Sequence, residues 1–318
     1  MQNGDTKKRW DQARAWTGLV TERIELSGGW SGRVSTAWRP GGLAAVEGPI
    51  EVSPAAWREA LGGLVQGAAG GERRALKLSK GTEVFRVRLE LGSASLEAVC
   101  KRFESRGRRH TRRNWERALG LQRSGIDTAL PLAWLERRRP AREAWMITEA
   151  IPGVVDLERM VSGLLLELDP DDARPVKRAL SKGVAGLCRA LEQAGLFHRD
   201  FKASNILVSN WESQPARLRL CLVDLDGIHR RRFYHGDAPW RAIMRLGASV
   251  AGCRALTRSD YLRFLRDYLD GGCLKAEGWK RRWRVLARSI EEYNRRSRGR
   301  KRGKLDGFSD ETMSVANR

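Results

Sequence analysis

The stretch that decides the fold is residues 198–205, which read His198-Arg199-Asp200-Phe201-Lys202-Ala203-Ser204-Asn205. At this spacing one rigid turn can aim Asp200 at an attacking hydroxyl, Lys202 at a γ-phosphoryl group and Asn205 at a Mg²⁺ ion. The alternative is a polar loop whose side chains only cap backbone groups. Because several residue types are fixed within so short a stretch, we favour a phosphoryl-transfer site, with Asp200 and Lys202 catalytic and Asn205 a metal ligand.

The sequence on either side of this loop fits the same interpretation. Residues 184–196 carry apolar side chains at helical spacing and end near Gly195, a common helix stop. Residues 205–208 and 217–223 read as two short strands separated by a turn. Asp224 follows the second strand in the run D-L-D, where a kinase-like enzyme places a second metal ligand. An isolated aspartate here would be an ordinary turn residue, but the preceding loop favours the metal ligand.

A lysine on a strand and a glutamate on the next helix are expected upstream, because such a pair holds the α- and β-phosphates of ATP in register. Residues 96–103 alternate apolar and polar side chains and place Lys101 on a strand, whereas Glu116 falls in a helical stretch. The alternative for Lys101 is a solvated strand lysine, and the neighbouring Arg102 could be mistaken for it. The alternative for Glu116 is a surface pair with a nearby arginine.

Two weaker signals concern the nucleotide. Residues 76–89 look like a strand, a tight turn and a second strand, and Gly81 in the turn can allow close backbone approach to a phosphate. The stretch has one glycine rather than the three of a glycine-rich loop, so an ordinary hairpin glycine is nearly as good an explanation. Residues 149–153 form an expected hinge, where we assign the backbone of Glu149 and Ile151 to adenine binding.

With these residues in place, the chain resembles the lipopolysaccharide kinase (Kdo/WaaP) family, bacterial kinase-fold enzymes that phosphorylate inner-core sugars of lipopolysaccharide. The stretches that carry the resemblance lie at 115–126, 148–153, 198–207, 222–226 and 256–268. The resemblance implies an α+β, bilobal, protein kinase-like fold with a small lobe of antiparallel sheet plus one helix and a mostly helical large lobe. It also implies ATP and Mg²⁺ as cofactors, Asn205 and Asp224 as the metal ligands, and Lys101 with Glu116 as an ion pair.

The implied reaction is transfer of the γ-phosphoryl group of ATP to a sugar hydroxyl of the lipopolysaccharide inner core or a related glycolipid. No A-P-E motif follows the D-L-D, which disfavours a peptide substrate. Residues 230–232 are three arginines that could meet an anionic acceptor, or simply form a solvated basic turn. A kinase acting on a protein or another small hydroxyl compound, and a basic RNA- or membrane-binding pseudokinase, are the alternatives.

Composition favours an anionic partner. Lysine and arginine number 60 against 38 acidic residues, which gives a formal charge of +22 and strong attraction to phosphate-rich surfaces, nucleic acid included. Charge alone does not identify the partner; with the family resemblance, an anionic glycolipid or sugar acceptor is the expected partner and nucleic acid the less favoured one. The five cysteines form no C-x-x-C pair and read as reduced residues of a cytoplasmic protein. The N-terminal residues lack a signal-peptide core, so we expect only peripheral contact at the inner face of the inner membrane. Residues 279–293 form an amphipathic stripe that could make this contact or pack on its own domain.

The organisation expected from these observations has four parts. Residues 1–60 would be an N-terminal extension containing a short hairpin, to which we assign no function. Residues 61–151 would form the small lobe and residues 152–293 the large lobe. Residues 294–318 are basic, have little to bury and are expected to be a disordered tail.

Overall fold

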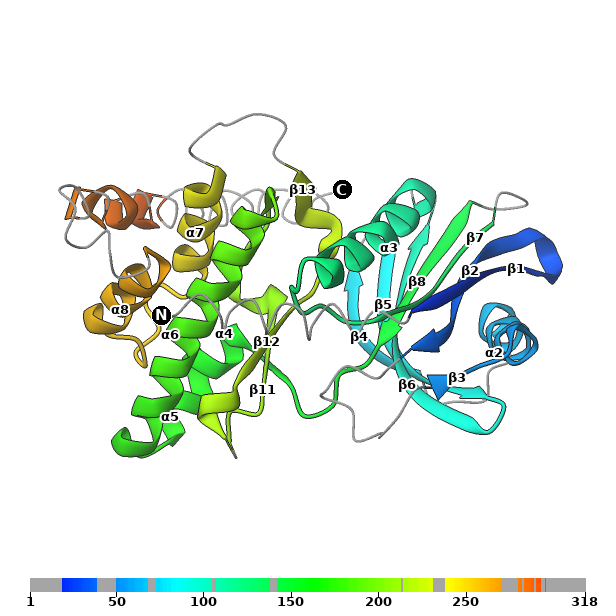
Figure 1. Ribbon diagram of the computed structural model, residues 1–318, viewed down its shortest axis with the longest axis horizontal. Coiled ribbons are helices and arrows are strands. Elements are labelled where there is room, and N and C mark those ends of the chain that lie inside the picture. Colours follow the sequence, from blue (N-terminus) through cyan, green and yellow to red (C-terminus); the bar gives the residue numbers. More distant parts are fainter. Residues whose placement is uncertain are drawn as a thin grey trace, which may run out of the picture. The chain divides into compact units, whose positions relative to one another are not determined.

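The computed structural model is divided into two compact units (Figure 1). Unit 1 comprises Met1–Val154 and Cys221–Asp226, and unit 2 comprises Val155–Leu220 and Gly227–Arg318. The structure describes residues 19–38, 50–67, 73–79, 81–104, 107–137, 142–212, 214–230, 238–269, 280, 281, 283–288, 290–292 and 295. Most of the expected tail, 294–318, therefore lies outside the described residues.

Unit 1 is built on an antiparallel sheet. Its strands are β1 (Val20–Leu26), β2 (Trp30–Trp38), β3 (Ile50–Glu51), β4 (Arg74–Ser79), β5 (Thr82–Leu91), β6 (Ala94–Glu104), β7 (Pro131–Arg137) and β8 (Glu143–Glu149). They run in the order β1-β2-β7-β8-β6-β5-β4, with β3 paired to β2. The hairpin β1-β2, which falls in the expected extension 1–60, thus belongs to the same sheet as the strands that follow it.

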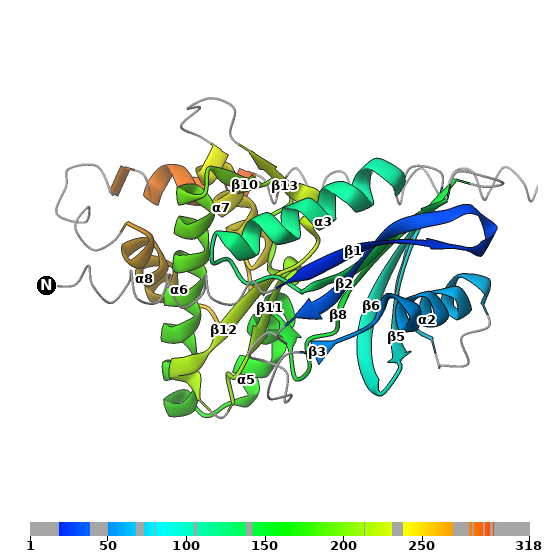
Figure 2. The same ribbon diagram turned by 45° about the vertical axis from the view of Figure 1, so that its right-hand side comes forward.

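The described part of unit 1 contains the helices α2 (Pro54–Gln66) and α3 (Gly107–Arg123) (Figure 2). Helix α3 is the helix expected in the small lobe, whereas α2 begins in the expected extension 1–60, for which no helix was predicted. Helix α2 begins at a capping serine, Ser53, whose hydroxyl accepts a hydrogen bond from the Ala56 N–H at 3.2 Å, and Pro54 occupies the first turn. This is a favourable helix start. Trp57 of α2 is fully buried against the sheet, and its indole N–H donates to the Ser35 carbonyl at 2.8 Å.

Successive side chains along a strand of this sheet pack against different helices, because they point to opposite faces. On β8, Trp145 packs into the apolar core that includes α2, whereas the next residue, Met146, packs with Phe103 and with Trp115 of α3. Successive strand residues point to opposite faces. Lys101 lies directly opposite Met146 in the β6-β8 ladder, so its side chain lies on the α3 face.

Unit 2 is mostly helical, with short strands. Its elements are β9 (Val155–Asp156), α4 (Leu157–Arg159), η2 (Met160–Leu164), α5 (Leu165–Glu167), α6 (Pro170–Gln193), β10 (Leu196–His198), η3 (Ala203–Asn205), β11 (Ile206–Ser209), η4 (Pro215–Arg217), β13 (Ile228–Arg230), α7 (Ala238–Ser249) and α8 (Arg258–Tyr268). The strand β12 (Arg219–Leu222) and the turn η5 (Leu225–Gly227) run across the boundaries with unit 1. Helix α6 ends just before Gly195, which has a φ of 66°, as the sequence predicted.

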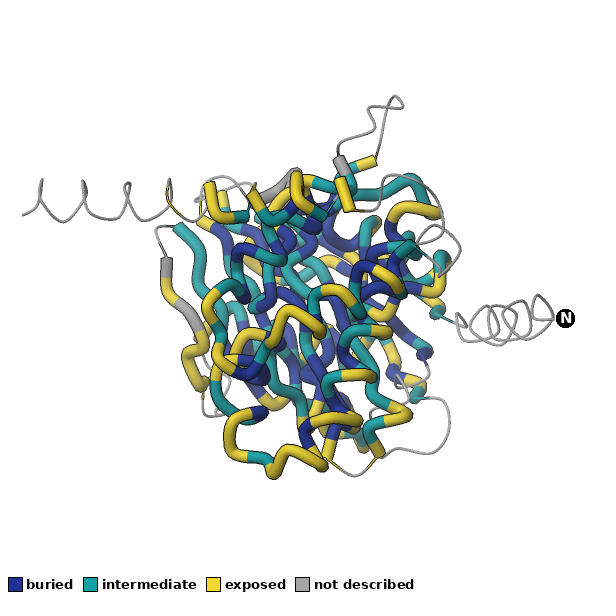
Figure 3. The backbone as a smooth tube through the Cα atoms, turned by 90° about the vertical axis from the view of Figure 1, so that its left-hand side faces the viewer, coloured by how far each residue is buried: buried dark blue, intermediate teal, exposed yellow. Residues whose placement is uncertain are grey.

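The apolar stripe of residues 279–293 packs on its own unit where the structure describes it. Leu286 is buried, and the ring of Trp283 lies 6.5 Å from that of Tyr261 on α8. A Cβ at Gly247 of α7 would lie 2.5 Å from Ile290, so this glycine permits the close packing. Along the helices, buried residues recur every three or four positions, so each helix has one buried and one exposed side (Figure 3). Among the described helices, none combines the length and apolarity needed to cross a membrane.

Helix α8 begins with a reciprocal cap. The Asp260 carboxylate accepts from the Thr257 N–H at 2.9 Å, while the Thr257 hydroxyl accepts from the Asp260 N–H at 3.4 Å. Asp260 is buried and pairs with Arg263 at 2.7 Å. Burial would raise the pKa of Asp260, but the Thr257 hydrogen bonds and Arg263 outweigh it and hold the pKa below its ordinary 3.8.

We expect Asp260→Asn to lower the free energy of unfolding by about 1 kcal/mol at neutral pH, since the cap and the ion pair both lose the charge. The folded pKa is depressed, so this stabilisation is complete above the unfolded-state pKa of 3.8 and is lost as the pH falls through the folded value. Urea unfolding of both proteins at neutral and acidic pH measures it. A difference that stayed constant with pH would contradict the assignment. Asp171→Asn, at a side chain that is 91% exposed, is the control.

Candidate active site

The loop 198–205 has a fixed backbone within unit 2. His198 is 1% exposed, and its Nδ1 accepts a hydrogen bond from the Asp200 N–H at 3.1 Å. The Arg199 N–H donates to the Gly227 carbonyl at 2.7 Å. The Asn205 side-chain amide donates to the Asp200 carbonyl at 2.9 Å. These three bonds hold the turn that carries Asp200.

Gly227 is required by the position of His198. A Cβ at residue 227 would lie 2.4 Å from Cε1 of the His198 ring, closer than non-bonded atoms approach one another. The ring also lies near Phe201, which is 1% exposed with its ring centroid 6.0 Å away. The glycine after D-L-D therefore makes room for the histidine that supports Asp200.

The structure brings Asp200, Lys202 and Asn205 together on this turn. Lys202 Nζ lies 2.8 Å from Asp200 Oδ2, and the two side chains are 37% and 54% exposed. Asn205 is buried, and its side-chain nitrogen donates to the loop backbone, which leaves the Oδ1 oxygen as the group that can bind a ligand. An accessible carboxylate beside a lysine and an amide oxygen suits phosphoryl transfer.

A second cluster lies in unit 1 around Lys101. The Lys101 Nζ atom lies 2.8 Å from Asp224 Oδ1 and 2.6 Å from Asp226 Oδ2. Burial would lower the pKa of Lys101, but the carboxylates of Asp226 and Asp224 outweigh it and raise the pKa above its ordinary value. Asp224 has a φ of 58°, a left-handed conformation that aspartate tolerates better than most residues.

Helix α3 holds the D-L-D run from one side. The Asn114 amide donates to Asp226 Oδ1 at 2.6 Å. The Arg117 guanidinium donates to the carbonyls of Leu225 and Asp226 at 3.1 and 3.3 Å. Side chain and backbone of the motif are thus both bound to one helix.

The segment after α3 holds the residue that precedes the motif. The Leu222 N–H donates to the Asp127 carbonyl at 2.9 Å, and the Thr128 hydroxyl donates to the Leu222 carbonyl at 2.7 Å. These bonds explain why Cys221–Asp226 belongs to unit 1 although its neighbours on both sides belong to unit 2.

The structure does not bring Glu116 to Lys101, which corrects the expected ion pair. Glu116 is 57% exposed and pairs with Arg112 at 3.0 Å, one helical turn away, the alternative left open by the sequence. The inward face of α3 is instead marked by Asn114, Ala118 and Leu121, which are all buried and lie at i, i+4 and i+7. This helical spacing is the signal that would have identified Asn114.

Arg102 takes no part in the Lys101 cluster. It pairs with Glu143 at 2.6 Å and lies near Glu83 at 3.5 Å, and its guanidinium lies 6.0 Å from the Trp145 ring centroid. Trp145 belongs to the core on the α2 face. Strand alternation therefore selects Lys101 rather than Arg102 for the α3 face.

The weaker nucleotide signals lie in unit 1 as well. Gly81 forms the turn between β4 and β5 with a φ of 70°. The N–H groups of Glu149 and Ala150 donate to the Leu130 and Glu97 carbonyls at 2.9 Å. These two N–H donors are thus used by hydrogen bonds within unit 1.

Two further expectations concern surface arginines and cysteines. Arg230 is exposed at the end of β13, whereas residues 231 and 232 lie outside the described residues. Cys100 and Cys188 are free and buried, and burial raises the pKa of Cys188 to about 12. Such thiols are protonated and unreactive at neutral pH.

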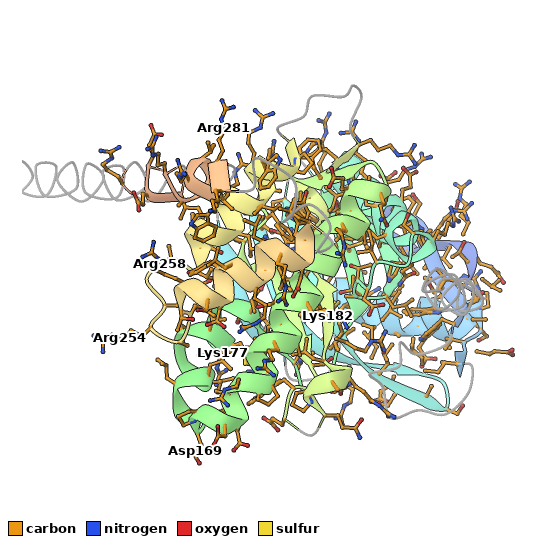
Figure 4. All side chains as sticks on the ribbon, turned by 60° about the vertical axis from the view of Figure 1, so that its left-hand side comes forward. Asp169, Lys177, Lys182, Arg254, Arg258 and Arg281 are labelled. Carbon is orange, nitrogen blue, oxygen red and sulfur yellow. The ribbon has the colours of Figure 1, made fainter. Side chains whose placement is uncertain are left out.

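Unit 2 also contains an apolar cavity of about 100 Å³. It is lined mainly by aliphatic and aromatic side chains of α6, α7, α8 and the helical residues that follow, among them Leu180, Val184, Leu246, Phe264, Trp283 and Leu286. The same elements carry basic side chains, of which Lys182, Arg258 and Arg281 are exposed (Figure 4).

The lipopolysaccharide kinase (Kdo/WaaP) family matches residues 93–268, which is more than half of the chain. The chain belongs to this family. The lipopolysaccharide core heptose(I) kinase WaaP of Escherichia coli is 28% identical over 160 residues, or 49% of this chain and 58% of that protein. The chain therefore matches less than two thirds of that relative's length.

A solved structure titled WaaP in complex with acyl carrier protein is 23% identical, with a TM-score of 0.54, and the match covers 71% of this chain and 91% of that one. This likeness concerns the fold. It confirms the predicted α+β, protein kinase-like fold, with the antiparallel sheet in unit 1 and the helices concentrated in unit 2.

We expect Gly227→Ala to cost about 1–3 kcal/mol of stability, because the added methyl group overlaps the His198 ring. Displacing the ring also removes the acceptor for the Asp200 N–H, so turnover should fall further than stability alone explains. Thermal unfolding and turnover at a temperature where the variant is folded measure the two effects. Gly186→Ala on α6, where an added Cβ has nothing within 4 Å, is the control; equal behaviour of the two variants would refute the packing argument.

Proposed function

We propose that this protein is an ATP-dependent kinase that transfers the γ-phosphoryl group to a sugar hydroxyl of the lipopolysaccharide inner core or a related glycolipid. The observation that carries the proposal is the loop built around Asp200, in which His198 and Asn205 fix the backbone and Lys202 pairs with the carboxylate at 2.8 Å. Membership of a lipopolysaccharide kinase family supports the substrate class.

In this mechanism the Asp200 carboxylate orients the acceptor hydroxyl and takes its proton late in the reaction. Phosphoryl transfer proceeds through a loose transition state, so correct positioning contributes more than proton abstraction. In the structure, the Lys202 ammonium pairs with the Asp200 carboxylate. During the reaction it would instead contact the transferred phosphoryl group, whose negative charge it would stabilise. The 54% exposure of the Asp200 side chain leaves it accessible to a hydroxyl.

The donor sets fit Mg²⁺, a hard cation that prefers oxygen ligands. Asp224 offers a carboxylate and Asn205 the amide oxygen that its own hydrogen bond leaves available. When bound, Mg²⁺ would supply positive charge that offsets the negative charge of the ATP phosphates. Lys101 would bind the α- and β-phosphates, and the Glu149 carbonyl and Ile151 N–H the adenine ring. Gly81 would permit backbone approach to a phosphate.

The basic composition supports an anionic acceptor. A formal charge of +22 attracts phosphate-rich surfaces over a range set by the ionic strength, and exposed Arg230 is one candidate contact. We place the reaction at the cytoplasmic face of the inner membrane, with peripheral contact only. A kinase with another hydroxyl substrate would retain turnover without labelling lipid, and an RNA- or membrane-binding pseudokinase would bind strongly at low salt and ignore nucleotide.

We expect Asp200→Ala to keep ATP affinity and lose turnover by about 10²–10⁴-fold, as for removal of a general base, and Asp224→Ala to lose the Mg²⁺-dependent part of ATP affinity. The assays are calorimetric ATP titration with and without Mg²⁺, and transfer of label from γ-labelled ATP into a glycolipid extract. Label in the lipid fraction with wild type alone supports the proposal. Turnover without lipid labelling would discard the acceptor class, and undiminished turnover by Asp200→Ala would discard the mechanism.

For unit 2 we propose a second activity, the binding of an acyl chain presented by a carrier protein. The supporting observation is the apolar cavity on elements with exposed basic side chains, since an acyl chain needs an apolar lining. The solved relative is a complex of WaaP with acyl carrier protein.

We expect Ser181→Phe, at the cavity lining, to weaken binding of an acyl-loaded carrier protein at least tenfold by filling the cavity, whereas Ser181→Ala should bind normally. Affinity is measured by calorimetry with loaded and unloaded carrier, with thermal unfolding as the check on folding. Equal affinity of wild type for the two carrier forms would rule out the cavity as the acyl site.

A further inference from the structure

A single carboxylate occupies the position between Lys101 and helix α3. One oxygen of Asp226 lies 2.6 Å from Lys101 Nζ, and the other accepts from the Asn114 amide at 2.6 Å. The expected helix glutamate, Glu116, is turned to solvent and paired with Arg112. The link between the lysine and the helix is therefore made through the second acid of the D-L-D run.

We propose that Asp226 is the residue that positions Lys101, that Asn114 and Arg117 hold Asp226 in place from helix α3, and that this arrangement replaces a lysine–glutamate pair between strand and helix. The proposal deepens the proposed function, because it rests on Lys101 binding the phosphates of ATP. It assigns to Asp226, Asn114 and Arg117 a positioning role that the motif alone does not indicate.

The burial of Asn114 supports this role. Its side chain belongs to a residue that is 4% exposed, and a buried amide must be satisfied by hydrogen bonds. Its nitrogen donates to Asp226, while its oxygen accepts from Arg117 at 3.1 Å. Both ends of the amide are thus committed to the network, and Arg117 continues it to the backbone of Leu225 and Asp226.

The choice of an amide at position 114 follows from the charge at position 226. A glutamate at 114 would face the Asp226 carboxylate with like charge, which is unfavourable at a short distance in a partly buried site. A neutral asparagine donates a hydrogen bond instead. In place of a carboxylate on the helix that pairs with the lysine, this chain has a carboxylate on the D-L-D motif and a hydrogen-bond donor on the helix.

The two acids then have separate tasks. If Asp224 were the sole partner of Lys101, a metal ion and the lysine would compete for one carboxylate. Asp226 gives the lysine a partner that is itself anchored to α3, so Asp224 is available to a metal without leaving Lys101 uncompensated. Leaving a partly buried ammonium without a counter-charge is costly.

The test measures the reactivity of the Lys101 amine in the free enzyme, without ATP or metal. Trace acetylation with acetic anhydride, read out on the Lys101 peptide by mass spectrometry, follows how readily the amine reacts when it is held in place. Replacing the carboxylate that holds the amine at 2.6 Å releases it from this position, so Asp226→Asn should label severalfold faster at a fixed pH. Glu116→Gln should label like wild type. Unchanged labelling of Asp226→Asn, or faster labelling of Glu116→Gln, overturns the proposal.

The exchange variant Asn114→Asp with Asp226→Asn separates positioning from a purely structural role. It restores an amide–carboxylate hydrogen bond between α3 and the motif but leaves Lys101 facing a neutral side chain. We expect the single variant Asp226→Asn to bind ATP more weakly than wild type. In the exchange variant, thermal stability should recover relative to Asp226→Asn, while the fast labelling and the weak ATP binding remain. If labelling and ATP affinity recover together with stability, Asp226 serves only to join the helix to the motif, and the proposal is wrong.

Nucleotide binding keeps this result distinct from the proposed function. Wild type that fails to bind ATP would refute the kinase, whatever the labelling of Lys101 shows. Normal ATP binding by wild type with unchanged labelling in Asp226→Asn would refute the positioning role alone.

Discussion

The charge of Lys101 constrains the rest of unit 1. The ammonium group is largely buried on the α3 face of the sheet, 5.2 Å from the Phe103 ring centroid, where an uncompensated charge would be strongly unfavourable. The compensating acids are supplied by a segment more than a hundred residues later in the chain, Cys221–Asp226. Strand β6, helix α3 and the returning segment are therefore joined by one network of ion pairs and hydrogen bonds.

In unit 2 the candidate site residues are held by close packing, whereas in unit 1 they are held by ion pairs. The loop around Asp200 is shaped by the buried His198 ring, and the ring fits because residue 227 has no side chain. The D-L-D run and its glycine thus serve both units, since the acids belong to unit 1 and the glycine to unit 2.

Local patterns predicted the elements near the site. The helix before the loop, the strand at Lys101 and the turn at Gly81 all follow from spacing and turn residues, and the structure has them. The choice of Glu116 was wrong because it followed residue type, whereas the phase of α3 is set by the burial of Trp115 and Leu121. A buried asparagine is a faint signal in sequence, because its partner is known only once the chain has folded.

Long-range pairing was also beyond the sequence. The hairpin β1-β2 joins the sheet through β7, pairing Val34 with Ala133, and nothing in residues 1–60 specifies a partner so far along the chain. Helix α2 escaped prediction for a related reason, since the glycines at 62 and 63 lower its helix propensity and its burial against the sheet offsets that cost.

Neither unit is encoded by one continuous stretch of the gene, because the chain crosses between the units more than once. The chain passes from one unit to the other after Val154, after Leu220 and after Asp226. A fragment ending at Val154 would contain the whole of the sheet and α3 but neither Asp224 nor Asp226, so Lys101 and Asn114 would be left facing each other without an acid. Exchanging unit 1 with that of a relative would require exchanging the separate segment Cys221–Asp226 as well. The two parts of the gene that encode unit 1 would therefore have to be exchanged together.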